Sequence, residues 1–365
     1  MSVLFGLKRK VNNSVYTYCV KPICFSQDPE KVHNFFISSG KNIGAFKLGK
    51  KVVRGLFNYQ NKILEQEILG INFRNPVGLS AGFDKNAELI SIMEDVGFGF
   101  VEVGSVSAKQ CDGNSGIRLK RIPEKKGIWV NLGLCNNGSL EISNRLKGKN
   151  FKIPFGVSIA RTNCAEVAET SEGIKDYVRS FEIFKEKGVG NYITINISCP
   201  NAYGGQPFSD SKRFESLIKE VVKVKIGKPI FVKMSPDLSS KNLDEIIRIS
   251  RKYKIQGFIC SNLTKEKGKP RGGFSGKIVE EKADKLLEYF YRKTKGEFVL
   301  IGVGGIFSAE DVYRKIRKGA SLVQLVTGMI YQGPGLIGQI NYDLVNLLRM
   351  DGFNSIEEAR GVDVK

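Results

Sequence analysis

Short apolar runs rich in β-branched residues alternate with segments of helical periodicity from residue 75 onward. Eight apolar runs have the length of buried strands: Pro76–Ser80, Phe98–Gly104, Phe155–Ile159, Tyr192–Ile197, Pro229–Met234, Gly257–Cys260, Phe298–Val303 and Leu322–Val326. Helical patterns lie between them at Asn86–Val96, Ser211–Val224, Asn242–Tyr253, Ile278–Arg292 and Ser308–Arg317. Strands that alternate with helices predict βαβ units and a parallel sheet.

Eight such units over about 270 residues fit a closed (β/α)8 TIM barrel better than an open sheet. The open doubly wound sheet stays an alternative, because periodicity does not give the order of strands. We expect the α/β barrel to span residues 71–350, followed by a C-terminal tail over 351–365. The segment between Ser105 and Lys152 exceeds one loop and one helix, so an excursion is expected after the second strand.

Residues 1–70 differ from the barrel pattern and predict an N-terminal helical extension. Asp28-Pro29-Glu30 is a helix start signal with proline in the first turn. An apolar stripe from Phe46 to Phe57 interleaves with four basic residues, Lys47, Lys50, Lys51 and Arg54. Basic amphipathic helices are typical of elements that lie on a membrane surface. The alternative is that the stripe packs on the protein's own core, and the order of residues 1–27 is left open.

Composition narrows the class of protein. Hydrophobic residues make up 41% and charged residues 26%, which excludes a disordered chain, a collagen and a coiled coil. No apolar run approaches the about 20 residues of a spanning helix. The net charge of +20 is compatible with a solvated lysine-rich surface, a nucleic-acid partner or an anionic membrane. With a single histidine and seven cysteines in no C-x-x-C pair, we expect no metal site and reduced thiols.

In a TIM barrel the active site lies at the carboxyl ends of the strands. The residues there are amides, two lysines, one cysteine and glycine-rich turns, with few carboxylates. This set argues against glycoside hydrolysis, which needs two carboxylates. The turn Gly302–Gly305 and the pair Thr327-Gly328 predict a phosphate site built from backbone amides, although tight-turn geometry alone would also explain them.

Three side chains at these ends are candidates for chemistry. Lys233 would suit an electron-rich cofactor ring, and Lys85 would suit a substrate carboxylate; a salt bridge to a neighbour is the alternative for each. Cys199 is the candidate base, because a thiol with a reference pKa of about 8.5 can remove a carbon-bound proton beside a carbonyl. The alternative is a buried cysteine that acts as a small hydrophobe.

Several long motifs resemble those of the dihydroorotate dehydrogenase family. Asn75–Asn86 is similar to its first-strand signature, and Asn196-Ile197-Ser198-Cys199-Pro200-Asn201 to its catalytic loop. Ile301–Ser308 and Gly319–Pro334 resemble the two halves of its FMN phosphate site. The resemblance implies an FMN-dependent TIM barrel that oxidises dihydroorotate to orotate in pyrimidine (UMP) biosynthesis.

The N-terminal Asp28–His33 segment resembles the membrane-associated class 2 enzymes, which reduce quinone. The resemblance implies peripheral membrane association through residues 30–57, with a quinone route between the helices. It also implies the cytoplasmic face of the cell inner membrane, in preference to the mitochondrial inner membrane. That class usually has serine as its base, whereas Cys199 here matches the soluble class 1 enzymes.

By position, the resemblance gives Cys199 as the catalytic base and places substrate against Lys85, Asn196, Asn201 and Asn262. It places FMN against Ala81, Gly82, Lys85, Ser105, Ser158, Asn196, Lys233, Ser261, Gly276, Gly305, Val326 and Thr327. Three residues depart from the family pattern: Val130 replaces a substrate-binding amide, Leu263 a threonine and Ser158 an FMN-facing asparagine. Asn131 would restore the amide through a shift of one residue.

Three other functions stay open from the sequence. Val130 and Leu263 are compatible with a related FMN oxidoreductase acting on a different cyclic amide. The positive charge is compatible with a tRNA-dihydrouridine-synthase-like enzyme, although no basic RNA-binding domain follows the barrel, so no nucleic-acid partner is expected. The last alternative is a flavoprotein that binds without turnover.

Overall fold

The computed structural model describes residues 2–265 and 271–364 of the chain. Within these residues eight parallel strands close into a barrel, so the predicted TIM barrel is confirmed and the open doubly wound alternative is wrong. The strands follow one another around the barrel in chain order: β3 Val77–Leu79, β4 Phe100–Val106, β7 Phe155–Ile159, β8 Tyr192–Asn196, β9 Ile230–Met234, β10 Gly257–Cys260, β12 Val299–Val303 and β13 Leu322–Leu325.

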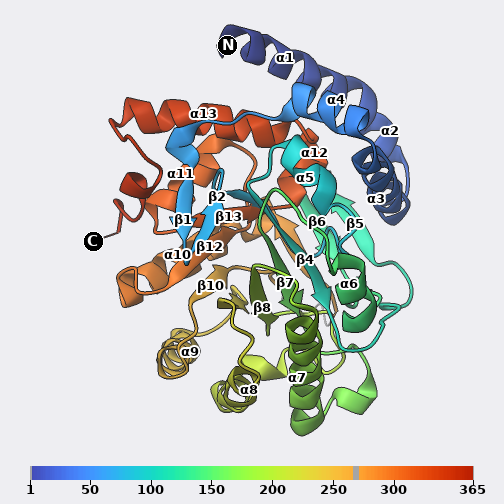
Figure 1. The fold of residues 1–365 in the computed structure, drawn as a ribbon, viewed down its shortest axis with the longest axis vertical. Helices are drawn as coiled ribbons and strands as arrows, with labels where there is room; N and C mark the ends of the chain where they lie inside the picture. The colour runs from blue at the N-terminus through green and yellow to red at the C-terminus, as the bar shows by residue number, and fades with distance from the viewer. Residues whose placement is uncertain (1, 266–270, 365) are drawn as a thin grey trace.

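Helices surround the strands on the outside of the barrel (Figure 1). They are α5 Ile90–Val96, α6 Ser139–Leu146, α7 Thr170–Lys187, α8 Ser211–Lys223, α9 Ser240–Lys252, α10 Glu280–Thr294, α11 Ala309–Arg317, α12 Thr327–Gln332 and α13 Leu336–Met350. The predicted helix from Asn86 begins only at Ile90. Ala87 has a positive φ of 57°, and the Asp84 carboxylate accepts the N–H groups of Glu88 and Leu89 instead.

The amino end of the barrel is closed by apolar packing. A hairpin of β1 Gln66–Ile68 and β2 Ile71–Phe73 places Ile68 and Phe73 against aromatic rings inside the barrel, those of Phe100, Tyr192 and Phe231. Gly78 and Gly156 make room for this layer, because a Cβ atom there would enter the rings of Phe100 and Tyr192. Chemistry is therefore confined to the carboxyl end.

The expected excursion after the second strand is present. It contains β5 Leu119–Ile122 and β6 Gly127–Val130, which pair in antiparallel register. Strand β11 Gly273–Gly276, which follows β10 in the chain, pairs with β6 and completes a sheet of three strands. This sheet contributes walls to the cavity described below.

The N-terminal extension consists of α1 Ser2–Val15, a π-helical segment Tyr16–Val20, α2 Lys21–Ser26, α3 Pro29–Ala45 and α4 Lys47–Phe57. Asp28 caps α3 as predicted, accepting the N–H groups of Glu30 and Lys31 at 3.0 and 2.9 Å. The labelled helices α1–α4 lie together at one edge of the barrel, near α5, α12 and α13 (Figure 1). No helix in the described part of the chain is both long enough and apolar enough to cross a bilayer.

Both ends of the described chain dock on the barrel. The Asn13 amide donates to Gln339 Oε1 on α13 at 2.6 Å, and the Tyr16 hydroxyl donates to the carbonyl of Ile330 at 2.7 Å. After α13, Asp363 accepts from Arg317 on α11 at 2.6 Å. Residues 2–26, whose order the sequence left open, are thus helical, and the contacts of Asn13 and Tyr16 hold them on the barrel.

Candidate active site

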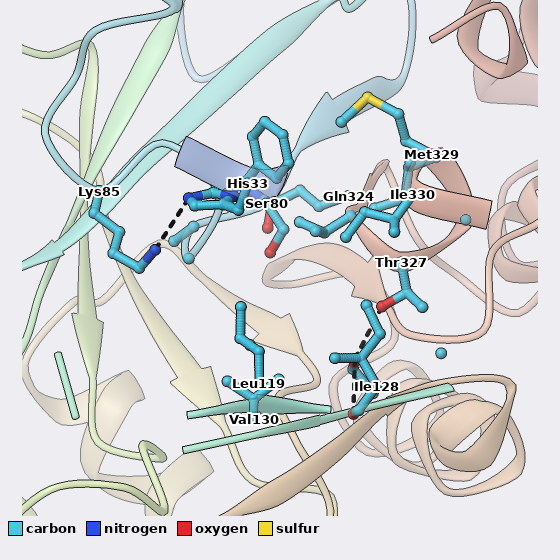
Figure 2. Close-up of a pocket in the computed structure, with 18 of the residues that line it drawn as sticks. His33, Ser80, Lys85, Leu119, Ile128, Val130, Gln324, Thr327, Met329 and Ile330 are labelled. Atoms are coloured by element: carbon cyan, nitrogen blue, oxygen red, sulfur yellow. Dashed lines mark hydrogen bonds between the residues drawn. The ribbon is translucent and has the colours of Figure 1, made fainter. Parts of the chain in front are cut away.

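A cavity of about 480 Å³ lies between the carboxyl ends of the barrel strands and the N-terminal helices. Figure 2 shows side chains that surround it. It brings together the catalytic and substrate-binding candidates Cys199, Lys85, Asn196, Asn201 and Asn262, and the cofactor-binding candidates Ala81, Gly82, Ser105, Lys233, Ser261, Gly276, Gly305, Val326 and Thr327. Strand ends that are far apart in sequence therefore converge on one site.

Ser158 is the predicted residue that does not line the cavity. It is fully buried, and its hydroxyl forms a hydrogen bond of 2.8 Å with the hydroxyl of Ser105. Ser105 also accepts from the Asn196 amide at 2.8 Å. Ser158 therefore contacts the cavity only through Ser105. Its side chain is shorter than the asparagine of the family pattern, which explains why it does not reach the cavity itself.

The amides on the barrel side form a connected network. Asn262 Nδ2 donates to Ser198 Oγ at 2.8 Å and to Asn196 Oδ1 at 3.3 Å. Two buried acceptors nearby, Asn201 Oδ1 and Gln324 Oε1, have no hydrogen-bond partner within the described residues. A buried polar atom without a partner costs about 1–3 kcal/mol, so these oxygens fit a ligand that brings N–H or O–H donors.

Glycines open a second part of the cavity. Gly304 and Gly305 have φ angles of 109° and 76°, and a Cβ atom on Gly305 would enter Glu280. A Cβ atom on Gly328 would likewise meet the carbonyl of Ile306. Beside them, Thr327 Oγ1 lies 2.9 Å from Ser275 Oγ (Figure 2). Backbone that only glycine can follow at close range suits the predicted phosphate site.

Cys199 lies half-buried with part of its surface on the cavity. The cavity is itself removed from bulk water, and this desolvation raises the pKa of the thiol to about 11. The backbone N–H groups of Asn201 and Ala202 and the charge of Lys233 oppose the rise. The site therefore holds a neutral thiol at neutral pH that becomes a strong base when it ionises.

Lys85 connects the barrel to the N-terminal extension. Its ammonium lies 3.3 Å from Nε2 of His33 on α3 (Figure 2, dashed line). Burial lowers the pKa of His33 to about 3, with Lys85 contributing in the same direction, so His33 is neutral and accepts the hydrogen bond. Burial also lowers the pKa of Lys85, against the opposing charges of Cys135, Glu30 and Asp84.

Two of the three departures from the family pattern lie on the cavity wall. Val130 and Leu263 both line it. Asn131 does not: its Oδ1 accepts from the amide of Asn114 at 2.9 Å, and Asn114 also donates to the carbonyl of Asn201 at 3.1 Å. The expected one-residue shift therefore leaves Asn131 in a supporting network behind the wall.

Among the cavity residues that were not candidates, His33, Ser80 and Gln324 have polar side chains whose contacts bear on the site. Gln324 carried a usable signal, since it is a lone polar residue in the apolar run Leu322–Val326. Ser80 ends the first predicted strand and was visible in the same way. His33 had none, because its contact depends on how α3 docks.

Comparison with known proteins agrees with this geometry. The family model described as Dihydroorotate dehydrogenase matches residues 63–348. The chain belongs to the dihydroorotate dehydrogenase family. Enzymes of this oxidoreductase family need a flavin cofactor. The cavity with its unpaired acceptors and glycine cradle is thus the candidate active site of a dihydroorotate dehydrogenase family member.

Relatives extend the match to the N-terminal helices. A protein of Trichodesmium erythraeum named Dihydroorotate dehydrogenase (quinone) is 34% identical over 96% of this chain and 99% of its own length. A protein of the same name from Sulfurimonas denitrificans is 35% identical over 95% of this chain and 98% of its own. The crystal structure of the Eimeria tenella dihydroorotate dehydrogenase in complex with ferulenol superposes with a TM-score of 0.79 at 26% identity, covering 92% of this chain and 96% of that one.

The lowered pKa of His33 can be tested through the pH dependence of protein stability. Because folding lowers the pKa of His33 from 6.5 to about 3, the unfolded state binds the proton more tightly, and stability falls as pH drops through this window. We expect the wild type to lose about 2 kcal/mol more than His33→Gln between pH 7 and pH 5, measured by urea unfolding. Glutamine keeps an acceptor for Lys85 but does not titrate. Equal losses in the two proteins would contradict the buried neutral imidazole.

Proposed function

We propose that this protein oxidises dihydroorotate to orotate in pyrimidine biosynthesis and passes the electrons through FMN to a quinone. The proposal rests on one observation: a single desolvated cavity holds a thiol, two lysines and unpaired amides beside a glycine cradle. The names of the relatives, Dihydroorotate dehydrogenase (quinone), support the substrate and the acceptor.

The residues fit FMN at two places. Gly276, Gly305, Val326 and Thr327 surround the glycine cradle, where backbone N–H groups would hold the phosphate. Ala81, Gly82, Lys85, Ser105, Asn196, Lys233 and Ser261 would line the ring, with Ser158 supporting Ser105. When bound, FMN supplies the two-electron acceptor that no protein side chain provides.

Dihydroorotate carries a carboxylate and ring amides, and the cavity offers a partner for each. The Lys85 ammonium would pair with the carboxylate, held in place by its contact with His33. Asn201 Oδ1 is a free acceptor for a ring N–H, while Asn196 and Asn262 hold each other in orientation. These contacts fix the substrate carbon beside Cys199.

Cys199 would act as the base that removes the C5 proton, and a bound flavin would supply the acceptor for the hydride from C6. The proton moves to Sγ, and Lys233 lies close enough to favour the thiolate. Exclusion of water makes that thiolate strongly basic. Deprotonation of carbon beside a carbonyl is thus within reach of this thiol.

The N-terminal half of the cavity suits a lipophilic electron acceptor. Apolar side chains from α3 and α4 line it: Val32, Phe36, Ile43, Val53 and Phe57. A quinone ring could approach the flavin along this wall without crossing bulk water. We assign residues 1–70 to the acceptor and membrane, 71–350 to flavin and substrate, and 351–365 to a tail.

The outer surface of the extension supports peripheral membrane association. Of sixteen exposed large hydrophobic residues in the described chain, ten lie between residues 11 and 56: Val11, Val15, Tyr18, Ile23, Phe35, Ile43, Phe46, Leu48, Val52 and Leu56. Lysines at 47, 50 and 51 lie among them. Apolar residues with a basic rim favour an anionic bilayer. We propose the cytoplasmic face of the cell inner membrane as the place of this association.

A second candidate has its own observation. Val130 and Leu263 place apolar surface on the cavity wall where the family pattern has an amide and a threonine. A related FMN oxidoreductase would bind a different cyclic amide with fewer polar ring groups. Replacing the amide and the threonine by Val130 and Leu263 would then cost it fewer hydrogen bonds to its substrate.

Anaerobic titration separates the two functions. We expect dihydroorotate to bleach the flavin of the purified protein and a soluble quinone to restore its colour. Cys199→Ala should keep its flavin but bleach about 100- to 10,000-fold more slowly, the range for loss of a general base. Cys164→Ala, a thiol outside the cavity, is the matched control and should behave as wild type. Flavin that stays oxidised with dihydroorotate but bleaches with another cyclic amide would support the second candidate.

The raised pKa of Cys199 predicts a pH dependence. Only the thiolate is a base, so below a pKa of about 11 the bleaching rate should rise about tenfold for each pH unit. Stopped-flow absorbance between about pH 6 and pH 9 measures this slope. Cys199→Ser should be slower throughout, since a hydroxyl ionises less readily. A profile that is flat for the wild type would exclude the thiol as base.

Membrane association can be tested on the exposed face. Leu48→Ser together with Val52→Ser removes two side chains that are 74% and 53% exposed. We expect at least about tenfold weaker sedimentation with anionic vesicles, because each buried aliphatic side chain contributes about 1.5–3 kcal/mol. Leu140→Ser on α6, where the side chain is 54% exposed, is the control and should bind as wild type. If the double variant bound vesicles as well as Leu140→Ser does, α4 would not be part of the membrane-binding surface.

A further inference from the structure

The barrel interior beneath the cavity contains a polar layer whose central carboxylate, Glu102, has no role in the site described above. Glu102 on β4, Thr194 on β8 and Gln324 on β13 are all 0% exposed. Inward side chains of alternate strands form layers in a TIM barrel, and such layers are usually apolar. A carboxylate in this position needs a physical reason, because burying a charge without partners is costly.

Glu102 is the centre of the layer. Its Oε2 accepts from Thr194 Oγ1 at 3.1 Å, from Gln324 Nε2 at 3.1 Å and from the Tyr192 hydroxyl at 3.4 Å. Its Oε1 has no hydrogen-bond partner within the described residues and lies 3.9 Å from Lys233 Nζ. One oxygen thus organises the layer, and the other faces an ammonium.

Lys233 links this layer to the cavity. Its side chain is 4% exposed and lines the cavity, and its ammonium donates to Ser80 Oγ at 3.2 Å. The titratable groups whose charges act on it are Glu102 and Cys199. Burial lowers the pKa of Lys233, while Glu102 is the main group that opposes this. Without Glu102, the ammonium would be a buried charge without a counter-ion.

Glu102 also fixes the direction of the Gln324 amide. The carboxylate accepts only, so the amide must turn its NH2 group toward Glu102. Oε1 then points away from Glu102, and it is a buried acceptor without a partner. Gln324 itself lines the cavity (Figure 2). An unpaired buried acceptor on a cavity wall indicates a donor on the ligand.

We propose that Glu102 is a positioning residue of the flavin site, which holds Lys233 as a charged donor and turns Gln324 so that Oε1 is an acceptor for the bound flavin. Glu102 does not line the cavity, so it acts through these two side chains. The inference rests on the proposed flavin site. A positive charge beside the ring favours the reduced, anionic cofactor, so Glu102 sets the flavin potential and its dependence on pH.

The test is the midpoint potential of the flavin in Glu102→Gln, measured in the holoenzyme between about pH 6 and pH 10. Burial lowers the pKa of Lys233 and Glu102 opposes this fall, so the inflection that marks loss of the Lys233 proton should lie at higher pH in the wild type than in the variant. Below that inflection, the variant should have a higher potential than the wild type, because the negative charge of Glu102 is gone. We expect at least a tenfold change in the reduction equilibrium, about 30 mV for two electrons. In a Lys233→Met background, Glu102→Gln should produce no inflection.

Asp284→Asn is the matched control. Asp284 is the partner of Lys315, another fully buried lysine, and neither residue lines the cavity. This variant should lose stability but keep the wild-type potential curve. A Glu102→Gln curve that superimposes on wild type, or an equal shift in Asp284→Asn, would overturn the proposal.

Gln324→Met carries the test if Glu102→Gln does not fold. Methionine has a similar volume but offers no oxygen, so we expect at least tenfold weaker flavin binding by fluorescence titration. An unchanged dissociation constant would overturn the proposed role of Gln324. A wild-type protein that holds no flavin would instead reject the proposed function, so the two failures are distinguishable.

Discussion

Helices α2, α3 and α4 cover the carboxyl end of the barrel, and the titratable side chains beneath them respond to the loss of water. The pKa of the Cys199 thiol is raised, while those of His33, Lys85 and Lys233 are lowered, with burial as the largest cause in each case. A barrel open to solvent at this end would return these groups toward ordinary values. The N-terminal extension therefore contributes to the chemistry of the site as well as to access.

Two further features hold this arrangement in place. Aromatic packing fills the amino end of the barrel, and the polar layer around Glu102 lies directly on it through the Tyr192 hydroxyl. At the other end, Glu30 at the start of α3 pairs with Arg118 beside the β5–β6 hairpin, with Nε and Oε2 3.0 Å apart. The contact between His33 and Lys85 depends on this docking, since one side chain comes from α3 and the other from the end of the first strand.

The barrel was predictable because parallel strands buried on both faces produce uninterrupted apolar runs. The strand that begins at Phe100 rather than at Phe98 shows the limit: Gly97, at a φ of 114°, ends α5, and the N–H of Phe98 still bonds to Met93. Glu102 and Gln324 were not predicted, although each is one polar residue in an apolar run, because only the closed barrel shows that both face inward and bond to each other. Sequence motifs identified the site residues at the strand ends. They could not show the contact between His33 and Lys85, because it forms only when α3 packs on the barrel.

The desolvated cavity bears on the proposed role of Cys199 as the base. A serine hydroxyl starts far above a thiol in pKa, and loss of water would raise it further. A thiol in this cavity reaches a pKa of about 11, which leaves a small but usable thiolate fraction and a base of high intrinsic strength. Lys233 lowers the pKa of Cys199, and Glu102 opposes the fall in the pKa of Lys233, so the buried layer and the catalytic loop are electrostatically connected. Any change that neutralises Lys233 would therefore act on the proposed base and on the proposed flavin site together.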